Sequence, residues 1–598
     1  MTGYNAPVRD MRFVLHDLVG MQRIAALPGN DHVSADLTDA ILEEAARFAG
    51  NVLAPLNHPG DKEGARLDAG GAHTATGFRD AYAQFVAGGW NALGCDPEYG
   101  GQGLPAVLGA AVKEMWNAAN MAFSLCPLLT TSAIEALHLV GTEAQKTMYL
   151  PKMVEGTWTG TMNLTEPQAG SDLAAVRTRA VPEEDQFRLY GQKIFITYGD
   201  HDMTENIVHL VLARLPDAPE GVRGISLFVV PKFLVNADGS LGARNDVHCV
   251  SLEHKLGIHA SPTAIMAYGD KDGAIGTLVG EANRGLEYMF IMMNRARFDV
   301  GLQGIAISDR AFQHALAYAQ NRVQGTEAGV RGGGRVAIIR HPDVRRMLMS
   351  MKSRTEAMSA LAYVVAAALD MAQRHPDAAE RASQQAMVDL LIPVVKGWST
   401  ESAIEIASIG VQIHGGMGFI EDTGAAQFLR DARILAIYEG TTGIQANDLV
   451  GRKIARDQGA AARLAIAEMR AVLARLDAGD DARVIQTALG DGIAQLEQAI
   501  AWVVKTYPTD PSTVLAGAVP LLHLFGVVAG GWQSARAAVA AADHLAAGDN
   551  EDPAFYRAKI GTARFYADHV LSQASGLAHA VMRGAAGVLA LEEGAFAG

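Results

Sequence analysis

The spacing of apolar residues divides the chain into helical and strand-like stretches. Between residues 8 and 155, apolar positions recur every three or four residues, which predicts helices, with a polar connection at 53–72 and a turn-rich loop at 95–103. From 158 to 280, short apolar runs rich in β-branched and aromatic residues predict strands, at 187–190, 193–197, 207–213 and 225–231. Gly191 separates the first two runs. Helical periodicity returns at 286–321, 341–374, 379–410 and 423–437, and again after 457.

These stretches predict a mainly α protein with a central β-domain. A chain of 598 residues is too long for one hydrophobic core. We expect a helical N-terminal domain (1–157), a β-domain (158–280), a helical bundle (281–456) and a helical C-terminal extension (457–598). The β-domain is expected to be a barrel or two packed sheets. A Gly-rich segment at 325–335 is expected to form an exposed hairpin or loop.

Charge and cysteine usage narrow the class of protein. A net charge of -15 argues against nucleic acid and anionic membranes as partners. The three cysteines are widely spaced and show no metal-ligand pattern, so we expect buried thiols in a reducing compartment and no metal. The first twenty residues lack the apolar region of a signal peptide, and a cytoplasmic location is expected. Residues 514–532 carry no charge, but Pro520 and His523 favour a buried helix pair over a membrane segment.

The strongest candidate for catalysis is Glu439. It follows the apolar run 434–438 and precedes Gly440, Thr441 and Thr442. A carboxylate that loses hydration has a raised pKa, and a base with a pKa near neutrality suits the removal of a weakly acidic proton. The alternative is a glutamate at a helix end, followed by the glycine that ends the helix.

Other segments could bind a cofactor. The polar loop 162–172 carries Thr165 and Ser171, whose hydroxyls could bind phosphate or ring heteroatoms. Phe195 and Thr197 lie two positions apart on one face of a predicted strand, where they could stack on a planar ring and hydrogen-bond to its edge. A Gly-rich turn at 412–418 could hold a pyrophosphate. Each segment also has a purely structural interpretation, and Arg297 and Arg322 could simply form surface ion pairs.

Known nucleotide and hydrolase signatures are absent from the sequence. There is no P-loop, no dinucleotide-type GxGxxG and no GxSxG elbow. This argues against a Rossmann nicotinamide site and against a serine hydrolase.

Taken in order, four motifs resemble those of the acyl-CoA dehydrogenase family. They are Thr165-Glu166-Pro167 with Ala169-Gly170-Ser171-Asp172, Phe195-Ile196-Thr197, Gln412 with Gly415-Gly416, and Tyr438-Glu439-Gly440-Thr441. The resemblance covers roughly residues 40–455. The N-terminal segment 4–13 and the extension after 457 are similar to a long bacterial branch of the family, which includes 3-methylmercaptopropionyl-CoA and fatty acyl-CoA dehydrogenases.

The resemblance implies a role for each candidate. Glu439 would be the catalytic base, and Arg297, Ser171 and Gly440 would contact the acyl-CoA substrate. FAD would be bound by residues from all four motifs and by one arginine, namely Thr165, Ser171, Phe195, Thr197, Arg322, Gln412, Gly416 and Thr441. Of these, Arg322, Gln412 and Gly416 would reach the FAD of a neighbouring subunit.

The implied reaction is α,β-dehydrogenation of an acyl-CoA to a trans-2-enoyl-CoA, in fatty acid β-oxidation or methylmercaptopropionate catabolism. Hydrogen bonds to the thioester carbonyl would stabilise the developing enolate. The resemblance further implies electron-transfer flavoprotein as acceptor and a homodimer, with a tetramer as the alternative. An acyl-CoA oxidase that uses O₂ and a non-catalytic flavin or acyl-CoA binding protein are the competing hypotheses.

The sequence also departs from the family pattern in three places. Phe195 stands where a Trp is common, Asn294 replaces an acidic residue seen near the CoA-binding Arg, and the 325–335 segment is inserted after Arg322. The change at Phe195 is expected to affect the properties of the bound flavin, and the change at Asn294 the contacts with CoA.

Overall fold

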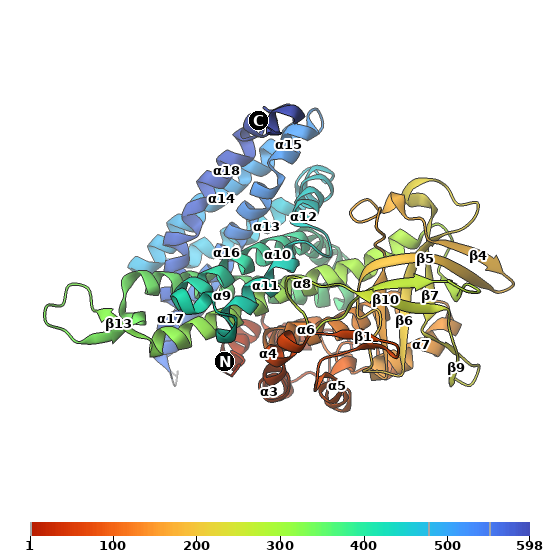
Figure 1. Cartoon of the computed structure of the whole chain (residues 1–598). Coiled ribbons are helices and arrows are strands. Elements are labelled where there is room, and N and C mark those ends of the chain that lie inside the picture. The colour runs from red at the N-terminus through yellow and green to blue at the C-terminus, as the bar shows by residue number, and fades with distance from the viewer. Residues whose placement is uncertain (1–2, 477–478, 549–551, 598) are drawn as a thin grey trace. The chain divides into compact units, whose positions relative to one another are not determined.

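The computed structural model describes residues 3–476, 479–548 and 552–597. The chain forms two compact units. The first comprises Met1–Ala46, Pro105–Ala118 and Val300–Gly598, and the second comprises Arg47–Leu104 and Ala119–Asp299 (Figure 1).

The second unit is built around an eight-stranded mixed sheet. Its strands follow the order β10-β11-β5-β12-β7-β6-β3, and β4 pairs with both β5 and β6. The pairings β4-β5-β12-β7-β6-β4 therefore close a ring, which confirms the predicted barrel-like β-domain. The strands are β3 Trp158–Asn163, β4 Arg179–Glu183, β5 Gln186–Thr197, β6 Asn206–Arg214, β7 Ile225–Pro231, β10 Val247–Leu252, β11 Thr263–Tyr268 and β12 Ala274–Val279.

Burial on both faces explains the composition of the central strands. All seven residues of β7 and eight of the nine in β6 are buried. One face packs on α7 (Glu143–Glu155) through a core that includes Trp158 and Leu210, and the other packs around Phe228 and Tyr268. Strands covered on both faces have near-continuous apolar runs, as this sequence does.

Two expectations for this unit need correction. The predicted break at Gly191 does not occur, and β5 runs through it. Glycine is needed there because a Cβ would lie 2.5 Å from Thr178 Oγ1 of the adjoining segment. The predicted connection 53–72 contains α4 (Ala54–Glu63) and a hairpin of β1 (Arg66–Asp68) and β2 (Gly71–His73). Pro55 does not prevent the helix, because it occupies the first turn where no N–H is required.

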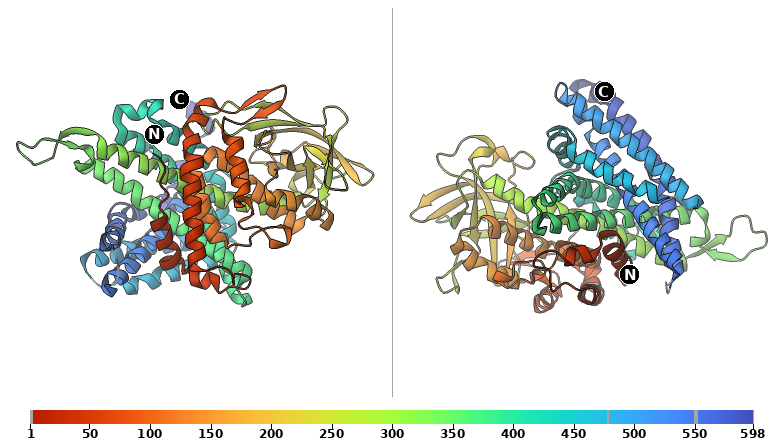
Figure 2. Two further views of the ribbon diagram at one scale, coloured as in Figure 1. Left: turned by 90° about the horizontal axis from the view of Figure 1, so that it is seen from below. Right: turned by 180° about the vertical axis from the view of Figure 1, so that it is seen from behind.

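The first unit is helical, as predicted. Its long helices include α9 (Pro342–Arg374), α10 (Ala378–His414) and the C-terminal part of α8 (Gly285–Asn321), followed by α11 (Ala425–Ala432) and α12 (Thr442–Asp448). The predicted C-terminal extension is also helical, and its helices lie side by side (Figures 1 and 2). They include α13 (Ala460–Ala471), α14 (Asp480–Thr506), α16 (Ala518–Ala547), α17 (Pro553–His569) and α18 (Ala574–Arg583).

The Gly-rich insertion forms the predicted hairpin. Strands β13 (Val323–Thr326) and β14 (Arg335–Ala337) pair antiparallel and extend away from the ends of α8 and α9 (Figure 2). Of the cysteines, Cys95 and Cys126 are buried as predicted, but Cys249 is only partly buried.

Among the described residues, two helices are long and apolar enough to cross a bilayer. They are α6 (Ala106–Val140) and α9, and 72% of the qualifying window in each is buried inside the protein. The uncharged segment 514–532 spans the end of α15 (Pro511–Ala516) and the buried half of α16, which confirms the predicted buried helix pair.

Candidate functional site

In the second unit, the polar loop 162–172 is fixed by a buried ion pair. Lys193 Nζ lies 2.8 Å from Glu166 Oε1 and also donates to Leu164 O at 3.0 Å. Glu166 accepts further hydrogen bonds from Arg177 N and from Thr178 N and Oγ1. Burial alone would raise the pKa of Glu166, but Lys193 and these donors lower it to about 2. The loop therefore has a fixed shape before any ligand binds.

Phe195 and Thr197 lie at the end of β5 beside this loop. Ile194 N donates to Thr165 O at 2.9 Å, which joins the strand to the loop. The Phe195 ring is 59% exposed although it flanks the buried Ile196, and Phe195 has a left-handed φ of 61°. An exposed aromatic ring held in an unfavourable backbone conformation is typical of a ligand-contacting position.

The remaining loop residues leave room for a ligand. Ser171 is exposed and Thr165 is half-buried. A Cβ added at Gly170 would meet nothing within 4 Å. Hydroxyl donors, an open glycine and an aromatic face therefore occur together on the loop and the strand end, as the predicted FAD contacts require.

Arg297 lies on α8 within the second unit and is buried, with 6% of its surface exposed. Its Nη1 donates to Asn294 Oδ1 at 3.3 Å, and its guanidinium lies 5.8 Å from the Phe290 ring centroid. The surface ion pair considered for Arg297 is therefore wrong. A buried guanidinium suits recognition of an anionic or strongly polar group.

In the first unit, Glu439 follows a short 3₁₀ turn, Arg433–Ala436, and is half-buried. Its φ is 54°, and that of Gly440 is 92°, so two consecutive residues are left-handed. Glu439 therefore does not continue a helix. Thr441 begins α12 as its N-cap, accepting from Ile444 N at 3.2 Å.

The neighbouring side chains surround the Glu439 segment with polar groups. Tyr438 donates its hydroxyl to Gln303 Oε1 at 2.5 Å. Burial raises the pKa of Tyr438, and the nearby Glu439 carboxylate raises it further. Lys396 Nζ donates to Gly440 O at 2.6 Å, and Gln445 Nε2 donates to Glu439 O at 3.2 Å.

The Gly-rich turn 412–418 lies at the end of α10 and is largely exposed. Gln412 and Gly416 are exposed, and a Cβ at Gly415 or Gly416 would meet nothing within 4 Å. Arg322 is exposed at the end of α8. These residues are accessible in the single chain, as expected for groups that would reach a neighbouring subunit's cofactor.

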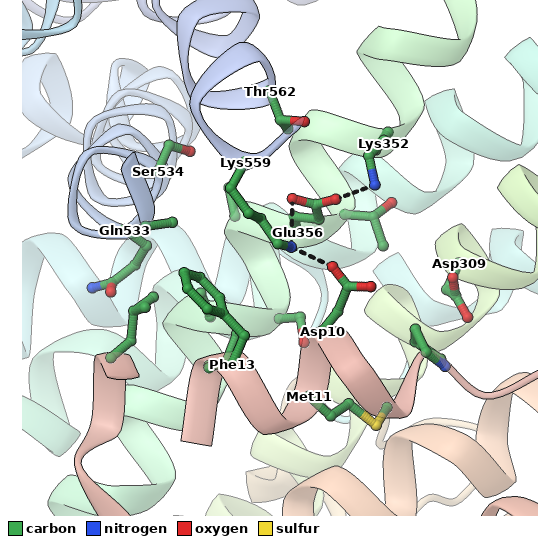
Figure 3. Close-up of a pocket in the computed structure, with 18 of the residues that line it drawn as sticks. Asp10, Met11, Phe13, Asp309, Lys352, Glu356, Gln533, Ser534, Lys559 and Thr562 are labelled. Atoms are coloured by element: carbon green, nitrogen blue, oxygen red, sulfur yellow. Dashed lines mark hydrogen bonds and ion pairs between the residues drawn. The ribbon is translucent and has the colours of Figure 1, made fainter. Parts of the chain in front are cut away.

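A separate cavity of about 160 Å³ lies within the first unit, and none of the predicted site residues lines it. Lys559 lies between Asp10 and Glu356, and Glu356 also pairs with Lys352 (Figure 3). Burial alone would raise the pKa of Glu356, but the two lysines lower it to about 2. This network joins the N-terminal helix α1 (Val8–Phe13) to α9 and α17.

Sequence reasoning missed three buried polar residues that hold these segments, namely Lys193, Lys396 and Gln445, each fully buried. A signal existed for two of them. Lys193 precedes the apolar run 194–196, and Lys396 stands alone between Val395 and Gly397-Trp398. A lysine inside a buried run requires a partner, and here that partner lies in a site loop.

Four family models match the chain in order. The acyl-CoA dehydrogenase N-terminal domain matches residues 36–157, the middle domain 161–269 and the C-terminal domain 283–455. A model described as acetyl-CoA dehydrogenase C-terminal like matches 465–592.

Several relatives match almost the whole chain, and two are described here. A 3-methylmercaptopropionyl-CoA dehydrogenase of Ruegeria pomeroyi is 52% identical over 96% of this chain and 97% of its own length. A broad-specificity linear acyl-CoA dehydrogenase of Mycobacterium tuberculosis is 35% identical over 96% of both. Among solved structures, an acyl-CoA dehydrogenase from Bacillus anthracis complexed with FAD has a TM-score of 0.74 at 19% identity, covering 96% of this chain and 91% of that one.

Proposed function

Because the chain belongs to the acyl-CoA dehydrogenase family, we propose that it is an FAD-dependent enzyme that converts 3-methylmercaptopropionyl-CoA to its trans-2-enoyl product. The observation that supports this choice of substrate is the 52% identity to the Ruegeria pomeroyi enzyme across 96% of this chain. Longer fatty acyl-CoA thioesters are the second candidate, supported by the 35% identity to the Mycobacterium tuberculosis enzyme.

The loop and strand end of the second unit have the groups needed to hold FAD. Phe195 offers an exposed ring, and the hydroxyls of Thr165, Ser171 and Thr197 are of the type that binds flavin edges and phosphates. The resemblance of the motif around Glu439 makes Thr441 a further proposed FAD contact. When bound, FAD supplies the acceptor for a hydride from the β-carbon.

Glu439 is the residue we assign as base. Its carboxylate would take the α-proton of the thioester as the β-hydride leaves, so that two hydrogens are lost and a carbon–carbon double bond forms. Its half-buried position beside Tyr438, which is also half-buried, limits hydration of the carboxylate. Arg297 and Ser171 are proposed contacts of the CoA thioester, and Gly440 places its backbone next to the base.

A chain-length series tests the substrate. We would measure kcat/KM for 3-methylmercaptopropionyl-CoA and for saturated acyl-CoAs of increasing length with the FAD-loaded enzyme. A pocket separates neighbouring chain lengths by only about 1–3 kcal/mol per methylene, so the preference must be read from the whole series. A maximum at the methylthio substrate or its isostere supports the proposal, and a maximum at a long chain supports the second candidate.

The electron acceptor needs its own test. We propose electron-transfer flavoprotein, and the alternative is an oxidase that uses O₂. Anaerobic reduction by substrate followed by reoxidation with electron-transfer flavoprotein, with little peroxide in air, supports the dehydrogenase. Rapid stoichiometric peroxide formation in air supports the oxidase, and failure of any acyl-CoA to reduce the bound FAD supports a non-catalytic binding protein.

We also propose a homodimer in which the turn after α10 meets a second copy. Phe419, Met417 and Ile420 are 88%, 47% and 48% exposed in the single chain, directly after Gly416. An apolar cluster of this kind beside an open glycine turn is typical of a covered surface. Light scattering on the FAD-loaded protein tests it, and Phe419→Asp should shift a dimer toward monomer.

A further inference from the structure

A buried lysine lies directly behind the peptide that follows the proposed base. Lys396 is near the middle of α10, within the apolar run of Val394, Val395 and Trp398, and it is fully buried. Its Nζ donates to Gly440 O at 2.6 Å. Burying an ammonium group is costly unless it forms strong hydrogen bonds. The buried ammonium of Lys396 therefore favours a backbone conformation in which the Gly440 carbonyl points toward it.

The segment it contacts has an unfavourable backbone conformation. Glu439 has a φ of 54°, a region that side-chain-bearing residues rarely adopt, and Gly440 follows with a φ of 92°. Such a conformation persists only when interactions with the surrounding structure offset its cost. A relaxed backbone at Glu439 would point its carboxylate in another direction.

Three hydrogen bonds hold this conformation from the side of α10 and α12. Lys396 binds Gly440 O, Gln445 Nε2 binds Glu439 O at 3.2 Å, and Thr442 Oγ1 donates to Glu401 Oε1 at 2.5 Å. The donor side chains of Lys396 and Gln445 are each fully buried. The carbonyls on both sides of the Glu439–Gly440 bond are thereby fixed.

The C-terminal extension in turn fixes the helix that carries Lys396. Two glycines of α16 receive the Trp398 ring: a Cβ at Gly526 would lie 2.2 Å from Trp398 Cγ, and one at Gly530 would lie 2.6 Å from Trp398 Cη2. Gly397 fits equally closely against Leu522, where a Cβ would lie 2.7 Å from Cδ1. Lys396 is thus next to two residues that interlock with α16.

We infer that Lys396 is a positioning residue that fixes the direction of the Glu439 carboxylate through the carbonyl of Gly440. The inference rests on the proposed role of Glu439 as base. Lys396 acts through Glu439 and forms no contact with the thioester in this role. It also gives the extension a function in catalysis, because α16 holds the helix from which the lysine projects.

The test compares Lys396→Met with Lys396→Arg, which keeps a cationic donor, and with Lys505→Met on the exposed surface of α14 as control. For each FAD-loaded variant we would measure kcat, KM, the melting temperature and the kinetic isotope effect with an acyl-CoA deuterated at the α-carbon. A displaced base slows proton removal without weakening substrate binding. We therefore expect kcat of Lys396→Met to fall about 100-fold with KM unchanged, and the α-deuterium isotope effect to increase.

A purely structural role would lower the melting temperature but leave the isotope effect of the folded enzyme unchanged. Lys396→Arg should recover part of kcat, and Lys505→Met should behave as wild type. If Lys396→Met does not fold, Gln445→Leu cuts the neighbouring bond and should also raise the isotope effect. Wild-type kcat and isotope effect in every folded variant would overturn the inference.

Glu439→Gln separates this inference from the proposed function. If Glu439→Gln loses activity and Lys396→Met does not, Glu439 is the base and only the positioning role is wrong. If Glu439→Gln keeps activity, the assignment of the base is wrong and the positioning role is rejected with it.

Discussion

The two units each hold a site segment with a buried lysine, but the lysines bind different partners. In the β-domain, Lys193 pairs with Glu166 Oε1, which also accepts from Thr178 N, while Glu166 Oε2 accepts from Arg177 N. In the helical unit, Lys396 donates to the backbone carbonyl of Gly440. The first contact ties together a polar loop and a strand, whereas the second fixes one peptide beside a single functional side chain.

The different partners predict different roles for the two lysines. Removing one partner of a buried ion pair leaves the other charge without compensation, which mainly costs stability. Removing the Lys396 donor frees the Gly440 carbonyl and with it the local backbone conformation. We therefore expect changes at Lys193 to act on folding and cofactor retention, and changes at Lys396 to act on the chemical step.

The largest expected effect on stability comes from Lys193→Met. It leaves Glu166 ionised and buried, and we expect a loss of about 3–5 kcal/mol in the free energy of unfolding. The measurement is urea denaturation, with FAD content as a second readout and Lys271→Met, an exposed lysine of the same domain, as control. Equal losses in the free energy of unfolding for Lys193→Met and Lys396→Met would contradict the different roles assigned to the two lysines.

Two buried glutamates sharpen the comparison through opposite pH dependence. Burial, together with the nearby Asp309, raises the pKa of Glu114 to about 8, whereas the pKa of Glu166 is lowered to about 2. The folded state therefore favours protonated Glu114, and this stabilisation is lost as pH rises from 4.5 toward 8. The stabilisation from ionised Glu166 is present above pH 4.5 and is lost as pH falls toward 2.

Glu114→Gln removes the first titration. Its free energy of unfolding relative to wild type should rise by about 1.4 kcal/mol per pH unit between pH 5 and 7, or about 3 kcal/mol in total. Glu166→Gln should have a lower free energy of unfolding than wild type near neutral pH, and this difference should shrink as the pH falls below 4.5. Denaturant unfolding at about pH 5, 6 and 7 measures the Glu114→Gln effect, and unfolding at about pH 3 and 4 measures the Glu166→Gln effect. Parallel stability curves for Glu114→Gln and wild type would contradict the assignment.

A smaller effect is expected where the extension packs on the helix of Lys396. Gly526→Ala places a Cβ against the Trp398 ring, and overpacking of this kind costs about 1–3 kcal/mol. Gly561→Ala, at an exposed position of α17 where an added Cβ would meet nothing within 4 Å, is the matched control and should stabilise by about 0.5–1 kcal/mol. If Gly526→Ala also raises the α-deuterium isotope effect, the extension acts on the base as inferred.

Much of this architecture can be predicted from local sequence. Apolar spacing gave the long helices, the strand-rich middle and the helical extension, because each follows from a period of 3.6 or 2 along one segment. The hairpin in 325–335 follows from its glycines. The helix 54–63 differs from the predicted connection because Pro55, which elsewhere would interrupt a helix, occupies the first turn, where a proline is compatible with a helix.

The contacts that hold the site segments are harder to predict. Lys193 is buried and Phe195 exposed on the same strand, and the pairing of β5 with β11 shifts register between Ala264 and Met266. That shift depends on a partner strand about seventy residues away. The left-handed backbone of Glu439 likewise depends on Lys396 from another helix, and no local pattern around 434–445 specifies it.

The most direct test of the proposed base is a single anaerobic turnover of FAD-loaded Glu439→Gln and wild type with 3-methylmercaptopropionyl-CoA. The rate of flavin reduction is measured from the loss of the flavin absorbance. Because a positioned general base contributes about 10²–10⁴-fold, we expect reduction to slow by about 10²–10⁴-fold while the variant retains FAD and binds substrate. Reduction at the wild-type rate would contradict the assignment of Glu439 as the base.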